Sequence, residues 1–199
     1  MKRLLGLLLV MGGCSSNTTD ITVPNTVAVK SPAAVHIEDV KTVDSAQTGE
    51  RSGLLYLINS ETPFTGIVVG KYQNGQKEWE SNYKNGREDG KATNWYESGQ
   101  KEIEGAHKNG KAEGPHTQWH DNGQKEAEGT YKDGKLEGKW TLWYPNGKKE
   151  AEETYKNGKP EGPYIEWYDN GQKCREGTSK GGKPLTGKHW DEEGNEIKE

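Results

Sequence analysis

Residues 119–138 read WHDNGQKEAEGTYKDGKLEG and residues 143–162 read WYPNGKKEAEETYKNGKPEG, so two neighbouring segments match at an interval of 24 residues. The same interval extends along much of the chain. Three sets of glycines keep it: Gly75, Gly99, Gly123, Gly147 and Gly171; Gly86, Gly110, Gly134, Gly158 and Gly182; and Gly90, Gly114, Gly138 and Gly162. A fixed period of this length indicates a repeat protein whose units bury surface against their neighbours.

Two turn signals in each unit predict short strands. Most of the repeated glycines follow Asn or Asp, as in Asn122-Gly123 and Asp133-Gly134. These dipeptides tolerate positive φ and close two-residue hairpins between antiparallel strands. We therefore predict an all-β fold. It is a meander of stacked antiparallel β-hairpins over residues 73–199, with strands that lead into it over residues 53–72.

Side chains between the turns alternate with a period of two. Ala127, Gly129 and Tyr131 are expected on one face of their strand, opposite Glu128 and Thr130. No helix-period stripe of any length competes with this pattern. Because both faces of the predicted sheet carry rings, the sequence leaves open which face is exposed.

A ladder of aromatic rings follows the same period. Its tryptophans are Trp95, Trp119, Trp143 and Trp167, and three tyrosines follow tryptophans directly, Tyr96, Tyr144 and Tyr168. Equivalent strands of a meander lie about 10 Å apart, so the rings would line the sheet. We take these seven residues as candidate binding anchors, because aromatic side chains supply large contact area at low entropic cost. The alternative is that the same rings only hold the sheet together.

Composition supports a folded array with little conventional core. Hydrophobic residues make up 29% of the chain, yet the formal net charge is only −4, and there are seven Trp and nine Tyr. All of the Trp and all but one of the Tyr lie from Tyr72 onward, which is where apolar surface can be buried. The near-neutral charge gives no electrostatic footprint for a nucleic-acid partner.

The N-terminus predicts export and lipid attachment. Residues 1–13 hold a short basic start and an apolar run far below the roughly 20 residues that cross a bilayer, as in a signal peptide. Gly12-Gly13-Cys14 resembles the bacterial lipobox, in which Cys14 would be lipidated, although Met11 stands where Leu is usual. Residues 14–52 are interpreted as a disordered tether. We expect a cell-envelope lipoprotein, in the outer membrane and facing the periplasm or the surface, held to the membrane by its N-terminal lipid.

Residue types that often carry chemistry are interpreted here as parts of the repeat. His116 and His120 are four apart, about 13 Å on a strand, which is too far to share a metal ion. The glutamates recur in every unit on an outward face and are expected to be solvated, so they offer no catalytic pair. We predict no enzyme activity, no cofactor and no metal site.

Cys174 departs from the repeat. It occupies the position that holds Glu in four earlier units, so we expect it to be exposed. An inert substitution is the first interpretation. An exposed thiol in an oxidising compartment leaves an intermolecular disulfide open as the alternative.

The two quoted segments resemble the MORN variant repeats of bacterial proteins, and Pro63-Phe-Thr-Gly66 resembles the usual beginning of such arrays. The resemblance spans about residues 54–199. It implies a hairpin sheet without catalytic residues, and a role in binding proteins or, less securely, phospholipids. Our leading hypothesis is a protein-interaction scaffold with an envelope protein as partner. The alternatives are binding of envelope glycan or lipid head groups, and an antitoxin or immunity role that rests on family naming alone.

Overall fold

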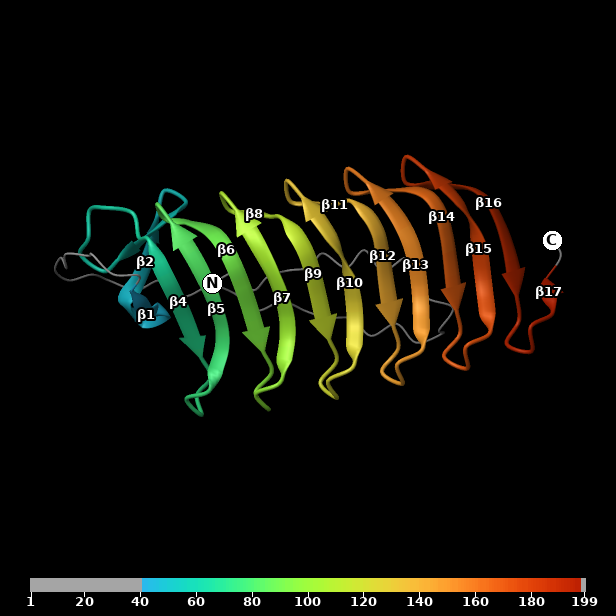
Figure 1. The fold of residues 1–199 in the computed structure, drawn as a ribbon, viewed down its shortest axis with the longest axis horizontal. Coiled ribbons are helices and arrows are strands. Elements are labelled where there is room, and N and C mark those ends of the chain that lie inside the picture. Colours follow the sequence, from blue (N-terminus) through green and yellow to red (C-terminus); the bar gives the residue numbers. More distant parts are fainter. Residues whose placement is uncertain (1–40, 198–199) are drawn as a thin grey trace.

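The computed structural model describes residues 41–197, so the predicted signal peptide, Cys14 and most of the predicted tether lie outside the described residues. Almost every described element is a strand, and the long ones form one sheet (Figure 1). Along the sheet the strands are β1 (Thr42–Asp44), β4 (Gly66–Lys71), β5 (Lys77–Lys84), β6 (Arg87–Trp95), β7 (Lys101–Lys108), β9 (Gly114–Trp119), β10 (Lys125–Lys132), β12 (Gly138–Trp143), β13 (Lys149–Lys156), β14 (Lys159–Trp167), β15 (Lys173–Lys180), β16 (Lys183–Trp190) and β17 (Glu196–Ile197).

From β4 onward, neighbours along the sheet are antiparallel and follow the order of the chain, which confirms the predicted all-β meander. Two short strands lie off this path. β8 (Lys111–Ala112) pairs with β7, and β11 (Lys135–Leu136) pairs with β10. The ribbon is a single layer, and within residues 41–197 no α-helix covers either face of it (Figure 1).

The two turns of each unit have different geometries. In the turn at Asp133-Gly134 both residues have positive φ, 50° and 80°, which is the hairpin turn that matches strand twist. In the turn at Asn122-Gly123 only the glycine has positive φ, 83°. There the Asn122 side chain accepts a hydrogen bond from the Gln124 amide at 2.9 Å. Both turns therefore use residues that the repeat supplies at fixed places.

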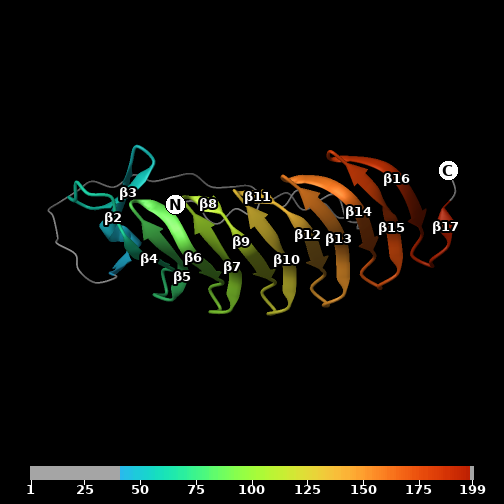
Figure 2. The same ribbon diagram turned by 45° about the horizontal axis from the view of Figure 1, so that its top comes forward.

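A β-bulge interrupts the ladder next to each repeated tryptophan. The pairing register shifts between Asn94 and Trp95, between Leu142 and Trp143, and before Trp167. A bulge adds one residue to one strand and bends it. The strands curve in the same sense along the sheet, as the tilted view shows (Figure 2).

The N-terminal edge of the sheet differs from the prediction. Residues 42–51, which the sequence analysis assigned to the tether, contain β1, the 3-10 turn η1 (Ser45–Gln47) and β2 (Thr48–Arg51). β1 pairs in parallel with β4, and β2 pairs with β3 (Leu54–Leu57) in a second, two-stranded sheet. Phe64, 1% exposed, is buried beside β3, where its amide donates a hydrogen bond to the main-chain oxygen of Leu55 at 2.8 Å.

The register divides the sheet into two faces. Cross-strand partners share a face, so Ser81, Ala92 and Gly105 lie in one row across three strands. The same row continues at His116 and Gly129. We call the side that carries this row the ring face. Its members in the later strands are Trp140, Glu153, Tyr164 and Gly177.

The core lies on the ring face. Ala127, Trp140 and Tyr155 form a buried cluster there, as the period-two alternation predicted for Ala127. Glycines in this row leave room for rings on the next strand, since a Cβ on Gly129 would lie 2.1 Å from the Trp140 ring. The opposite side, which we call the charged face, carries Glu104, Glu128 and their equivalents.

Candidate functional site

The tyrosines that follow the ladder tryptophans bind the next unit. Tyr96 donates its hydroxyl to the main-chain oxygen of Trp119 at 2.7 Å, and Tyr144 donates to that of Trp167 at 2.9 Å. Tyr168 and Trp190 make the same pair at 2.9 Å. Burial of the phenols, with nearby carboxylates adding to it, raises the pKa of Tyr96 and of Tyr144 to about 12. Both hydroxyls therefore remain donors over the physiological range.

His120 takes the place of tyrosine in one unit. Its Nε2 lies 2.8 Å from the main-chain oxygen of Trp143, in the position that the Tyr hydroxyl has elsewhere. His116, by contrast, lies on the ring face inside β9 and is 3% exposed. Within residues 41–197 no three His, Cys, Asp or Glu side chains are arranged to hold a metal ion.

Lysines cover the indoles of the ladder on the charged face. Lys125 Nζ lies 5.7 Å from the centre of the Trp143 ring and pairs with Glu128 at 2.9 Å. The same arrangement recurs in the other units with distances to the ring centre of 5.4–5.8 Å, at Lys77 and Trp95, Lys101 and Trp119, Lys149 and Trp167, and Lys173 and Trp190. One face of each indole is thus already in contact with a cation of its own chain.

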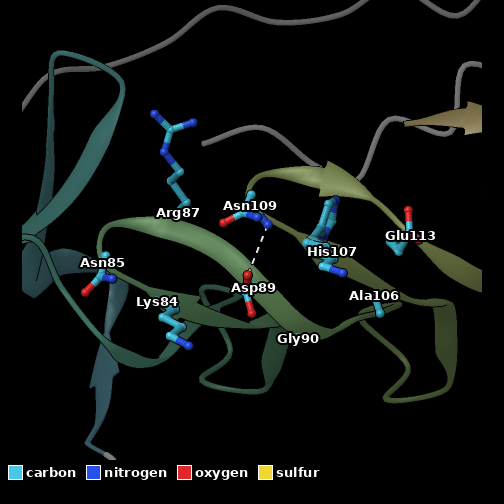
Figure 3. Close-up of a pocket in the computed structure, with 10 residues that line it drawn as sticks. Lys84, Asn85, Arg87, Asp89, Gly90, Ala106, His107, Asn109 and Glu113 are labelled. Atoms are coloured by element: carbon cyan, nitrogen blue, oxygen red, sulfur yellow. Dashed lines mark hydrogen bonds between the residues drawn. The ribbon is translucent and has the colours of Figure 1, made fainter. Parts of the chain in front are cut away.

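Acidic side chains tie the other row of turns together. The carboxylate of Asp89 accepts a hydrogen bond from the Asn109 amide at 3.1 Å, and Glu113 does the same for the Asp133 amide at 2.8 Å. Figure 3 shows the Asp89 bond beside an open depression that also exposes Arg87 and Lys84. These two cations extend in opposite directions, so the depression has no convergent set of groups.

The bonds between units are therefore nearly uniform, and we call them the seams: the Tyr or His bond to the next main chain, the Lys contact with the next indole, and the acidic cap on the next turn. The seven predicted anchors all belong to seams. Their rings are half-buried, and the tyrosine hydroxyls are engaged inside the array. The interpretation that these rings hold the sheet together thus accounts for their contacts.

Positions on the ring face, in contrast, differ from unit to unit. The position of Ala92 holds His116, Trp140 and Tyr164 in the following units, and that of Gly105 holds Gly129, Glu153 and Gly177. Two further positions on the ring face also vary from unit to unit. The first holds Ile103, Ala127, Ala151 and Arg175, and the second holds Asn94, Gln118, Leu142 and Glu166. The sequence analysis missed this surface. It searched for residues that recur every 24 positions, whereas this face is marked by residues that differ at equivalent positions of the units.

Charged groups collect on the ring face over β13–β15. Glu166 is 5% exposed, and its carboxylate lies 3.2 Å from the Arg175 guanidinium. Glu153 accepts a hydrogen bond from the Tyr155 hydroxyl at 2.7 Å. Burial raises the pKa of both carboxyl groups, and the charge of Arg175 opposes this shift. Glu166 is not one of the repeated glutamates that were expected to be solvated, because its position holds an uncharged residue in earlier units.

Cys174 is also buried. Its exposed fraction is 1%, and it is not a free cysteine, so the expectation of an exposed thiol was wrong. The bulge in the neighbouring pairing between Glu166 and Trp167 breaks simple alternation at this end of the strands. The intermolecular disulfide stays a prediction.

Each unit of the array is a hairpin of two long strands with a bulge, two glycine turns and a set of seams. The MORN repeat variant matches four tandem segments of the chain. They are residues 88–109, 112–133, 136–157 and 160–180. Each MORN-variant match covers the turn at Gly99, Gly123, Gly147 or Gly171 with the strands around it. No curated protein matches the chain. In the part of the chain that the structure describes, no helix has the length and apolar character needed to cross a membrane.

Proposed function

We propose that this protein is a non-catalytic interaction module, tethered to the cell envelope through a lipid on Cys14, that binds a protein partner with its ring face. The observation that carries the proposal is the separation of uniform and variable positions. Seam residues repeat because each makes the same contact in every unit. Residues on the ring face change from unit to unit, which is how a repeat array adapts one surface to an irregular partner.

The variation also favours a protein over a regular polymer. A glycan with a constant repeat is matched best by identical units, whereas the ring face has four different, largely buried residues at one equivalent place, namely Ala92, His116, Trp140 and Tyr164. Stacking of sugars on the ladder tryptophans is disfavoured as well, since a lysine lies over each indole. The ring face offers buried rings beside charged groups, a mixture typical of protein interfaces.

Site-specific photo-crosslinking in cells tests this proposal. A crosslinking amino acid at Leu142, on the ring face, should capture a discrete envelope protein. The matched control places it at Thr130, which is exposed on the charged face and should give none. Capture from Thr130 alone, or from neither position under any growth condition, would contradict the proposal.

A repeat-guided variant supplies a second test. Glu153→Gly restores the residue that three other units carry, so the sheet should fold normally. Binding to the captured partner should weaken at least about tenfold, while Thr130→Ala leaves it unchanged. Equal affinity of all three proteins would argue that the ring face is not the interface.

The anchor and the alternative ligands are tested separately. Cys14→Ser should release the protein from membranes and abolish incorporation of labelled palmitate. Cosedimentation of the unlipidated protein with anionic liposomes or purified cell wall would instead support lipid head-group or glycan binding. An antitoxin role predicts a toxic protein as the crosslinked partner.

A further inference from the structure

Two histidines occupy inner positions of the ring face in consecutive strands. His107 stands where other units have Tyr83, Tyr131 and Tyr155, and His116 stands where the two following units have Trp140 and Tyr164. The side chain of His107 is 10% exposed, and His116 is 3% exposed. The array has thus replaced phenol and indole rings by titratable ones at one place.

His116 is packed by rings from the two following strands of the sheet. Its imidazole is stacked with Trp140 at 5.7 Å between centres, and it meets the edge of Tyr131 at 5.3 Å. Among the described residues, the buried His116 Nε2 has no hydrogen-bond partner. The same holds for His107 Nδ1.

The groups that face the pair do not neutralise two cations. From β6, the carboxylate of Glu88 lies 3.6 Å from His107 Nε2, and from β5 the Tyr83 hydroxyl lies 3.5 Å from Glu88. From β10, Tyr131 faces His116. Within residues 41–197, the charge that acts on His116 is that of His107, which repels a second proton. In the described part of the chain, the carboxylate of Glu88 can therefore pair with a protonated His107, whereas no carboxylate is placed to pair with a protonated His116.

We propose that the junction of β7, β9 and β10 around His107 and His116 is acid-labile, so that mild acidification opens the array there while the units on either side stay folded. A protonated His116 would be a buried cation without a counter-ion or acceptor, which is costly. Because stability in a repeat array is carried between nearest neighbours, the cost is felt at this junction. The inference concerns stability alone and is independent of the proposed partner binding.

The direction of the effect follows from linkage. Burial, with the charge of His107 adding to it, lowers the pKa of His116 from 6.5 to about 4. A lowered pKa in the folded state means that stability is complete above pH 6.5 and is lost as the pH falls toward 4. At about pH 5 the opening constant of the junction should be about 20-fold larger than at pH 7.

Hydrogen exchange followed by mass spectrometry tests the proposal on the whole protein at about pH 7 and pH 5, with rates corrected for intrinsic exchange. Amides of β7–β10 should lose roughly 20-fold of their protection at the lower pH, while those of β13–β15 do not. His116→Phe combined with His107→Tyr should remove this loss. His120→Tyr, which restores the residue of other units outside the junction, should keep it.

Two outcomes would overturn the proposal. One is a loss of protection at pH 5 that is equal over β7–β10 and β13–β15. The other is a loss at β7–β10 that persists in the double variant or disappears in His120→Tyr. If His116→Phe does not fold, His116→Gln keeps a polar, uncharged side chain of similar length, and the same comparison decides.

Discussion

The hydroxyl of Tyr144 donates a hydrogen bond at 2.9 Å to the main-chain oxygen of Trp167, which lies 23 residues further along the chain. The distance along the chain is almost one full unit, so the bond holds one hairpin to the next and not the two strands of one hairpin. Tyr72 and Trp95 make the equivalent bond at 2.6 Å. Side chains therefore add to the backbone ladder in linking the units.

Tyr144→Phe is expected to weaken one seam. It removes the hydroxyl but keeps the ring, and it leaves the Trp167 oxygen without this donor, so the free energy of unfolding should fall by about 1 kcal/mol. Urea unfolding measured by Trp fluorescence gives the value. Tyr96→Phe should cost a similar amount, because it breaks the same bond at another seam. If both variants unfold at the wild-type urea midpoint, the hydroxyl bonds contribute nothing to stability.

Gly129→Ala is expected to disrupt the ring face. A Cβ at this position would lie 2.1 Å from Trp140 Cε3, so the indole must move, and we expect a loss of about 2–3 kcal/mol. Gly49→Ala is the control, because a Cβ there meets no atom within 4 Å. Thermal unfolding followed by circular dichroism compares the two. Equal melting temperatures would show that the Trp140 ring is free to relocate.

Lys125→Met tests the contact between lysine and indole. Lys125 is 45% exposed, so its ion pair with Glu128 is screened, and the loss should stay below about 1 kcal/mol. The remaining difference from wild type should shrink in about 1 M NaCl, where exposed charges are screened. Lys132→Met, on an exposed position of the same strand, should have a smaller effect. A larger loss for Lys132→Met would contradict the assignment.

The carboxylates of β13–β15 should respond to acid in the direction opposite to His116. Burial raises the pKa of Glu153 and Glu166, so folding favours their protonated forms. A raised pKa in the folded state means that this part of the array gains stability as the pH falls toward that pKa. Slower corrected amide exchange in β13–β15 at the lower pH would show it.

Glu153→Gln should reduce that gain and raise stability at neutral pH, because the amide is uncharged and can still accept from Tyr155. Glu128→Gln, which alters an exposed carboxylate of the charged face, should preserve the gain in β13–β15. Faster exchange of β13–β15 at pH 5 in the wild type would contradict the assigned direction.

The sequence predicted the meander well, because turn dipeptides such as Asp133-Gly134 act locally and recur at a fixed interval. It did not predict β1, since Thr42–Asp44 has no ring and no period, and the strand depends on its pairing with β4. The glutamates at the equivalent positions of earlier units also misled the prediction for Cys174, which lies beside a bulge and is buried. The ring face became visible only when the register placed the variable residues side by side.

The bulge next to each ladder tryptophan has a consequence for longer relatives of the same design. The bulge bends the strands across the ribbon, so each further unit would repeat the same bend beside its neighbours. An array with one unit more would extend the same curved surface, and one with a unit fewer would shorten it. The number of copies thereby sets how far along an elongated target the surface reaches, and gene duplication alone could tune it.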